Sequence, residues 1–164
     1  MAARQVYLAS DLIPRLVNGP QINGAEVATA DIGFDVLAFD PATAEYAYLV
    51  IDWPQGSSTT ATVTFEWTVT TGGSGAVRWE ASMRCYADGD AVDQSQGTAQ
   101  AVTDAWQADM DWHISGATGS ITPSGTVAAG APCMLLISRQ PTHADDTMSG
   151  ADASLIRIVV NFSP

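Results

Sequence analysis

Residues 60–88, TATVTFEWTVTTGGSGAVRWEASMRCYAD, decide the fold class of this chain. Apolar and polar side chains alternate along residues 61–69, and the alternation resumes at residues 76–86 after a glycine-rich TGGSG segment. A period of two places every second side chain on one face of a strand, so each segment predicts a β-strand with one buried face. We interpret the two strands as a β-hairpin. The expected core side chains are Val63, Phe65, Trp67, Val69, Val77, Trp79, Ala81, Met83 and Cys85.

Further short strands are expected on both sides of this segment. The clearest signals are YAYLVIDW at 46–53, CMLLISRQ at 133–140 and SLIRIVVNFS at 154–163. About eight or nine strands, with almost no helical periodicity, predict an all-β fold: an antiparallel two-sheet β-sandwich that is jelly-roll-like. YAYLVIDW is apolar on both faces, which suits a central strand or a strand whose outer face is covered by a partner chain.

The N-terminal part of the chain differs from the rest. Its short apolar stretches are separated by turn-forming residues at Pro14, Asn18-Gly19-Pro20 and Asn23-Gly24. We therefore expect an extended N-terminal arm over residues 1–32 and a β-sandwich domain over residues 33–164. A total of 164 residues suits one such domain.

The charge balance excludes two classes of partner. The chain has 18 acidic residues against 6 basic ones, a net charge of −12, and all the basic residues are arginines. Nucleic-acid binding and anionic membrane surfaces both require basic clusters, which this sequence lacks, so we expect neither partner. No secretory leader is evident at the start of the chain, and we expect synthesis in the cytoplasm.

The two cysteines, Cys85 and Cys133, lie in no CxxC motif and have no histidine beside them. An intracellular chain that is large enough to form a core seldom relies on a disulfide. We therefore expect two buried free thiols, which pack as small hydrophobic groups. A disulfide that bridges the sandwich is the alternative.

Motifs that carry catalysis or metal binding are missing from the sequence. There is no GxSxG elbow, no HExxH and no paired Cys/His spacing. Aspartates cluster at residues 88–93 and 145–152, but they lack the ligand spacing of an EF-hand, and aspartates in turns usually bond to their own backbone. We therefore expect a protein that is not an enzyme, with no catalytic residues, no cofactor and no metal.

Trp106 and Trp112 lie six residues apart in an acidic stretch, AWQADMDWH, at 105–113. Two exposed indoles beside carboxylates would stack on sugar rings, so these residues are candidate glycan contacts. Packing at the rim of the sandwich is the interpretation that we favour, because tryptophan is mostly buried. His113, in the same stretch, is expected to be hydrogen-bonded or exposed.

Several segments together resemble β-sandwich structural proteins of tailed bacteriophages. They are YLVIDWP, the 60–88 segment with its DGD extension, GTAQAVTDA, and the closing part CMLLISRQPTHADDTMSGADASLIRIVVNF. The resemblance covers roughly residues 34–162. It implies a small virion component that is made in the host cytoplasm and is commonly a trimer, with no catalytic residue. We predict a capsid decoration or cement protein whose partners are the major capsid protein or other virion proteins; the alternative is a head or tail fibre, or a receptor-binding module that contacts host glycan.

The apolar residues of the N-terminal arm are the candidate partner contacts. An arm laid on a neighbouring shell subunit would bind through main-chain and apolar contacts. An arm folded against its own sandwich is equally compatible with the sequence. The proposed anchors are Leu8, Leu12, Ile13, Leu16, Val17 and Ile22.

Overall fold

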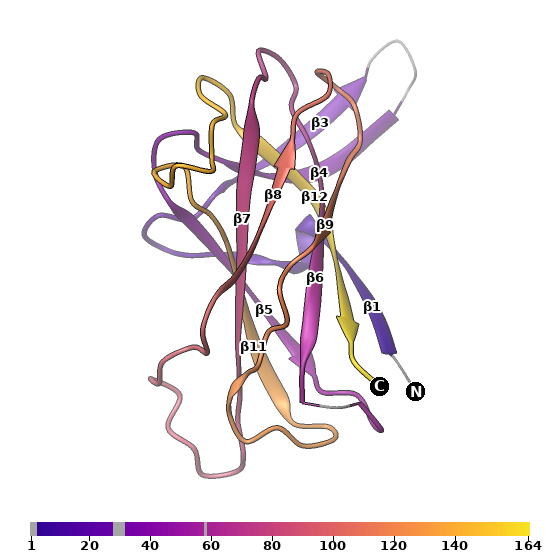
Figure 1. Ribbon diagram of the computed structural model, residues 1–164, viewed down its shortest axis with the longest axis vertical. Helices are drawn as coiled ribbons and strands as arrows, with labels where there is room; N and C mark the ends of the chain where they lie inside the picture. Colours follow the sequence, from indigo (N-terminus) through magenta and orange to yellow (C-terminus); the bar gives the residue numbers. More distant parts are fainter. Residues whose placement is uncertain (1–2, 28–31, 58) are drawn as a thin grey trace.

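The chain folds into two β-sheets that pack face to face (Figure 1). The computed structural model describes residues 3–27, 32–57 and 59–164. Within these residues, helical structure is limited to one 3-10 turn, η1 (Ala9–Asp11). Sheet A contains β1 (Ala3–Leu8), β3 (Gln21–Val27), β4 (Ile32–Phe39), β6 (Ala61–Thr68), β9 (His113–Ala117) and β12 (Ala153–Phe162). Sheet B contains β2 (Ile13–Pro14), β5 (Glu45–Asp52), β7 (Ala76–Cys85), β8 (Gln100–Ala105), β10 (Ser124–Gly125) and β11 (Pro132–Arg139).

The strand order is that of a jelly roll. The main strands of sheet A run in the order β4-β12-β6-β9, and those of sheet B run in the order β5-β11-β7-β8. Successive strands alternate between the sheets at almost every connection, which is the winding that two interlocked Greek keys produce. The predicted all-β sandwich of jelly-roll type is therefore confirmed.

The strands β6 and β7 do not form a hairpin, which corrects the interpretation of residues 60–88. β6 pairs with β12 and β9 in sheet A, whereas β7 pairs with β11 and β8 in sheet B. The connection at 69–75 is an arch between the sheets, with Gly72 and Gly75 at φ of 75° and 85°. Alternation shows only which face of a strand meets the core, and strands in one sheet or in facing sheets satisfy it equally.

The predicted core faces of β6 and β7 are confirmed, because every side chain expected there is buried. Phe65 of β6 stacks on Trp79 of β7, with ring centroids 5.1 Å apart and an interplanar angle of 9°. Phe39 of β4 meets the same indole edge-on at 5.1 Å. Such pairs add about 0.5–1.5 kcal/mol each beyond the burial of their area. The two strands therefore contact each other through side chains across the core.

Residues 3–27 are part of the sandwich, which corrects the expectation of an extended N-terminal arm. β1 pairs with β12 along its whole length, from Ala3↔Phe162 to Leu8↔Arg157, and its Tyr7 packs against the core. β2 pairs with β5, and β3 pairs with β4. The alternative, an arm folded against its own sandwich, is what the structure shows. Pro14 lies in β2 and Asn23-Gly24 lies in β3, so only Asn18-Gly19-Pro20 separates two strands, and none of these residues marks a linker.

Cys85 and Cys133 form a disulfide, which corrects the expectation of two free thiols. The two residues lie opposite each other on β7 and β11, so the bond links neighbouring strands of sheet B and does not join the two layers. Forty-eight residues separate the cysteines along the chain. Only the register of β7 against β11 brings them together, and that register cannot be read from the spacing of the cysteines.

Replacing both cysteines by alanine should lower the free energy of unfolding by about 3–4 kcal/mol, because the disulfide restricts a long loop of the unfolded chain. Urea denaturation of the double variant and of the oxidised protein measures this difference. A matched check is thiol alkylation after unfolding without reductant. Labelling of two thiols under that condition would contradict the disulfide.

The guanidinium of Arg139, at the end of β11, is fully buried. Its Nε and Nη2 donate to the two carboxylate oxygens of Asp146, at 3.0 and 3.1 Å. Nη1 donates to the carbonyls of Phe39 and Ala151, and Nη2 also donates to the carbonyl of Met148. These contacts join sheet B to β4 of sheet A and to the loop that leads into β12.

Asp146→Ala should destabilise the protein by about 3–5 kcal/mol, because it leaves the Arg139 charge buried without its counter-ion. Asp145→Ala is a matched control: Asp145 is exposed and forms an ion pair with Arg78 at the surface. An exposed pair contributes about 0–1 kcal/mol, so this control should unfold close to the wild type. Equal destabilisation by the two variants in urea would contradict the role assigned to the buried pair.

Candidate interaction surfaces

The six candidate anchors of the N-terminal segment do not form one surface. Leu12 is buried in the core, so it is wrong as a partner contact. Leu8 is exposed on β1 of sheet A, and Ile22 is exposed on β3 of the same sheet. The other three, Ile13, Leu16 and Val17, are exposed together at the edge of sheet B. Folding of the segment into both sheets is the reason for this separation.

Residues 13–17 form an apolar edge ridge beside β5. Ile13 pairs with Tyr48, and the Arg15 N–H donates to the Tyr46 carbonyl at 2.9 Å. The Tyr46 N–H in turn donates to the Asn18 carbonyl at 2.9 Å. The backbone of the ridge is thereby fixed while its side chains face solvent, and Leu16 is 103 % exposed. Such a ridge is preorganised for contact with another surface.

The following turn depends on a glycine. Asn18 adopts a φ of 57°, a left-handed conformation that asparagine tolerates better than most residues. A Cβ atom at Gly19 would collide with the backbone of Arg15, so a larger residue there would push the ridge away from β5. The geometry of the ridge is therefore set by local backbone requirements.

The outer face of β5 confirms that this strand is apolar on both sides. Ala47, Leu49 and Ile51 face the core, while Tyr48 and Val50 are half-buried or exposed on the other side. Next to Val50 lies a groove of about 380 Å³ with Tyr86, Val92 and Met134 among its lining residues. The groove and the edge ridge lie beside different parts of β5, since the ridge pairs with residues 46–48 and the groove is lined by Val50.

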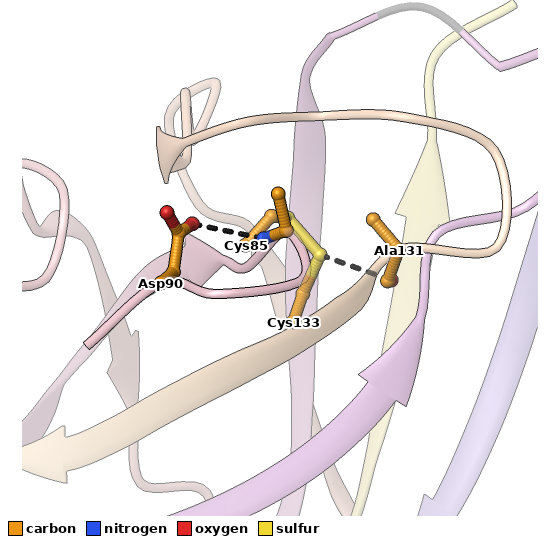
Figure 2. The surroundings of a disulfide bond; sticks show 5 residues. Cys85, Asp90, Ala131 and Cys133 are labelled. Atoms are coloured by element: carbon orange, nitrogen blue, oxygen red, sulfur yellow. Dashed lines mark hydrogen bonds between the residues drawn. A yellow bond between two sulfur atoms is a disulfide. The ribbon is translucent and has the colours of Figure 1, made fainter. Parts of the chain in front are cut away.

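The disulfide lies at this groove, which Cys133 helps to line. In Figure 2, Asp90 lies on one side of the disulfide and Ala131 on the other. The Asp90 carboxylate accepts a hydrogen bond from the Ala87 N–H at 2.8 Å. Asp90 therefore caps the turn at the end of β7, as expected of an aspartate that bonds to its own backbone.

Asp145 and Asp146 are also bound within the protein. Asp145 contacts Arg78 at 3.1 Å, and Asp146 is held by Arg139. Among the residues that the structure describes, no group of three or more His, Cys, Asp or Glu side chains is placed to hold a metal ion. These carboxylates have structural roles that account for their presence.

Trp106 and Trp112 face different neighbours. The Trp106 indole N–H donates to Asp109 at 3.2 Å, and the ring packs against the core. Trp112 is 47 % exposed and donates to Glu66 at 2.7 Å, with the Arg157 guanidinium 5.6 Å from its ring centroid. Phe34 lies tilted beside it at 5.8 Å. Packing against the core, the interpretation favoured from the sequence, describes Trp106, whereas Trp112 remains half exposed on the outer side of sheet A.

The loop that carries these tryptophans is anchored at two points. The carboxylate of Asp109 accepts hydrogen bonds from the backbone N–H groups of Gly73 and Gly72, and these bonds lower its pKa. The His113 side chain is buried. Its Nε2 accepts a hydrogen bond from the Gln107 N–H at 2.9 Å, and its Nδ1 lies 3.0 Å from the carbonyl oxygen of Asp111. The ring is thus a neutral tautomer with its proton on Nδ1. It is a structural histidine.

A second cluster of carboxylates lies near Arg139. Burial raises the pKa of Glu45, and the neighbouring Asp40 and Asp152 charges raise it further, against the lowering effects of the Asp40 backbone hydrogen bond and of Arg139. The folded state therefore binds this proton more tightly than the unfolded chain. At neutral pH the ionised Glu45 therefore lowers the free energy of unfolding. This destabilisation disappears as the pH falls from the raised pKa of the folded state to the ordinary pKa of 4.5.

Asp40→Asn should raise the thermal midpoint at pH 7 by about 1–2 °C, because it removes a like charge beside Glu45. The amide oxygen keeps the acceptor that caps the Ala42 and Thr43 N–H groups. The gain should vanish at pH 3.5, where Glu45 is protonated. Thermal unfolding at both pH values checks this; an equal gain at both would mean that charge repulsion is not its cause.

Sequence reasoning missed an exposed apolar surface on the other side of the molecule, the outer face of sheet A. In β9 the usual pattern is inverted: His113 and Ser115 are buried, and Ile114 between them is exposed. The Ser115 hydroxyl accepts from the Phe65 N–H at 2.9 Å, which satisfies this polar group inside. The alternation of His113, Ile114 and Ser115 would place the isoleucine inside, so the sequence pattern gives no signal for this face.

Comparisons with known proteins leave the family of the chain open. No protein-family model matches it, and a search of curated proteins finds no matching sequence. Within the described ranges, no helix has the length and apolar character needed to cross a membrane. Function is therefore inferred from the surfaces above and from the sequence resemblance.

Proposed function

We propose that this protein is a structural component of a tailed-bacteriophage virion, and that it binds the capsid shell as a decoration or cement protein. Its partners would be the major capsid protein or other virion proteins, and it would act as a homo-oligomer, with a trimer as the expected form. The role is not enzymatic. Jelly rolls are common in capsid proteins, but because fold alone does not imply function, the proposal also needs a surface.

The observation that carries the proposal is the edge ridge at residues 13–17. It presents Ile13, Leu16 and Val17 to solvent on a backbone that is fixed against β5. Burial of a fully exposed aliphatic side chain contributes about 1.5–3 kcal/mol. A rigid apolar ridge suits a protein that docks on a preformed shell, because little conformational entropy is lost on binding.

Two further features support a role on a particle surface. The disulfide between β7 and β11 suits a protein that persists in an oxidising environment, and virion surfaces are such an environment. The net charge of −12 keeps the remaining surface soluble at the high local density of a shell. Glycan binding by a fibre or receptor-binding module has less support, since the indoles of Trp106 and Trp112 are each engaged by neighbouring side chains.

A double change, Leu16→Ser with Val17→Ser, should weaken binding to capsid shells at least tenfold, because about 1.4 kcal/mol of lost apolar burial already corresponds to that factor. Co-sedimentation with purified shells measures the change. The matched control is Ile22→Ser, since Ile22 is 68 % exposed and Val17 is 69 % exposed, but Ile22 lies on the other sheet. If the double variant bound shells as tightly as the wild type, the ridge would not be the shell contact.

A further inference from the structure

The outer face of sheet A carries a second apolar surface. Two of its exposed side chains come from β1, one from β4, two from the loop before β9 and one from β9 itself. Scattered single hydrophobic side chains are normal on a protein surface, whereas a continuous patch marks an interaction site. The exposed members are Val6, Leu8, Ile32, Met110, Trp112 and Ile114.

These side chains are continuous across the sheet. Leu8 and Phe34 line one shallow groove together with Ile156. Phe34 and Ile156 also line the neighbouring groove, which contains Ile32, Met110 and Trp112. Ile114 on β9 lies opposite Glu66 of β6, whose carboxylate accepts the Trp112 indole N–H. The two grooves therefore connect apolar side chains from Leu8 of β1 to Trp112 before β9, and Ile114 lies beyond the Glu66 carboxylate.

The size of the face is close to that of an interface. A large apolar residue that is fully exposed presents about 200 Å² of surface. The six side chains are about half exposed, so together they present roughly 600 Å². A specific interface buries about 800 Å² per partner. The half-buried residues between the six, such as Phe34, supply part of the remainder.

The charge of this face differs from that of the whole chain. Near its centre, Arg157 lies 2.8 Å from Glu66, so that the one carboxylate beneath Trp112 is neutralised. A second arginine, Arg4, is exposed on β1, while Asp35 and Asp111 each line one of the two grooves. Two of the six basic residues of a strongly acidic chain thus lie on one face.

We propose that the outer face of sheet A is a self-association surface, occupied by the same face of a second copy of this chain. Such a contact pairs two copies about a two-fold axis, so it is additional to the contacts that would hold the trimer proposed above. Two copies with a net charge of −12 repel each other over most of their surfaces. On this face two arginines stand against three carboxylates, so the repulsion is smaller, and the exposed Arg4 of one copy is complementary in sign to the groove carboxylates of the other. A face that combines apolar side chains with charges of both signs meets the requirement of a self-complementary contact.

This inference does not depend on the virion role, because it concerns the free protein in solution. The shell contact is assigned to the edge ridge of sheet B, on the opposite side of the sandwich. Failure of shell binding and failure of self-association are therefore separate results.

Sedimentation equilibrium over a wide range of protein concentration tests the proposal. Wild-type protein should associate, and Ile114→Asp should weaken the association at least tenfold by placing a charge in the apolar face. Ile13→Asp is the matched control: Ile13 is 64 % exposed and Ile114 is 61 % exposed, but Ile13 lies on the edge ridge. The control should associate like the wild type, and Leu8→Asp should behave like Ile114→Asp.

Three results would overturn the proposal: a wild-type protein that is monomeric at every concentration, an Ile114→Asp variant that associates normally while retaining its thermal midpoint, or equal weakening by Ile13→Asp. Loss of shell binding by Ile114→Asp with unchanged association would assign the face to the shell, and would equally overturn self-association. Because Ile114 is exposed, the fold of the variant is expected to survive, and circular dichroism checks this.

Discussion

The buried guanidinium of Arg139 is the constraint around which one end of the sandwich is arranged. A charge removed from water needs a counter-ion and acceptors for its remaining N–H groups, and here Asp146 and three backbone carbonyls supply them. One carbonyl belongs to β4 of sheet A, so the same side chain holds the two layers together. Asp146 also accepts from the Arg78 N–H, and Thr147 accepts from the Ala76 N–H, which anchors the start of β7. The loop at 140–152 is therefore ordered by a polar network before the chain enters its closing strand.

The aromatic core lies between the two sheets, and the outer side of each sheet carries some exposed apolar side chains. Sheet B presents the edge ridge and the groove beside the disulfide, and sheet A presents the surface around Trp112 and Ile114. Aspartates lie close to both surfaces: Asp88 and Asp90 line the groove on sheet B, and Asp35 and Asp111 line the grooves on sheet A. The net charge of −12 opposes non-specific contact between copies, so association is favoured only where apolar burial or charge complementarity outweighs the repulsion.

The burial of individual strand faces was predictable, and their partners were not. The alternation in residues 60–88 identified the core side chains correctly, since that pattern depends only on the local geometry of a strand. The hairpin was wrong because a facing strand buries the same residues as a neighbouring strand. The arm was wrong because residues that usually form turns, Pro14 and Asn23-Gly24, lie here inside short strands, which look irregular until a neighbouring strand pairs with them. The free thiols were wrong because adjacency depends on register across 48 residues.

The sequence by itself determined that the chain is an acidic, lysine-free β-sandwich, and which side chains of its longest strands lie inside. Periodicity and composition are properties of the sequence itself, so conclusions drawn from them do not require knowledge of the fold. Only the tertiary structure decided that β6 and β7 face each other across the core, that Cys85 meets Cys133, and that Leu12 is buried while Leu16 is exposed. It also decided which exposed apolar residues share a surface. Those facts are relations between distant segments, and they exist only once the strands have been assigned to sheets and set in register.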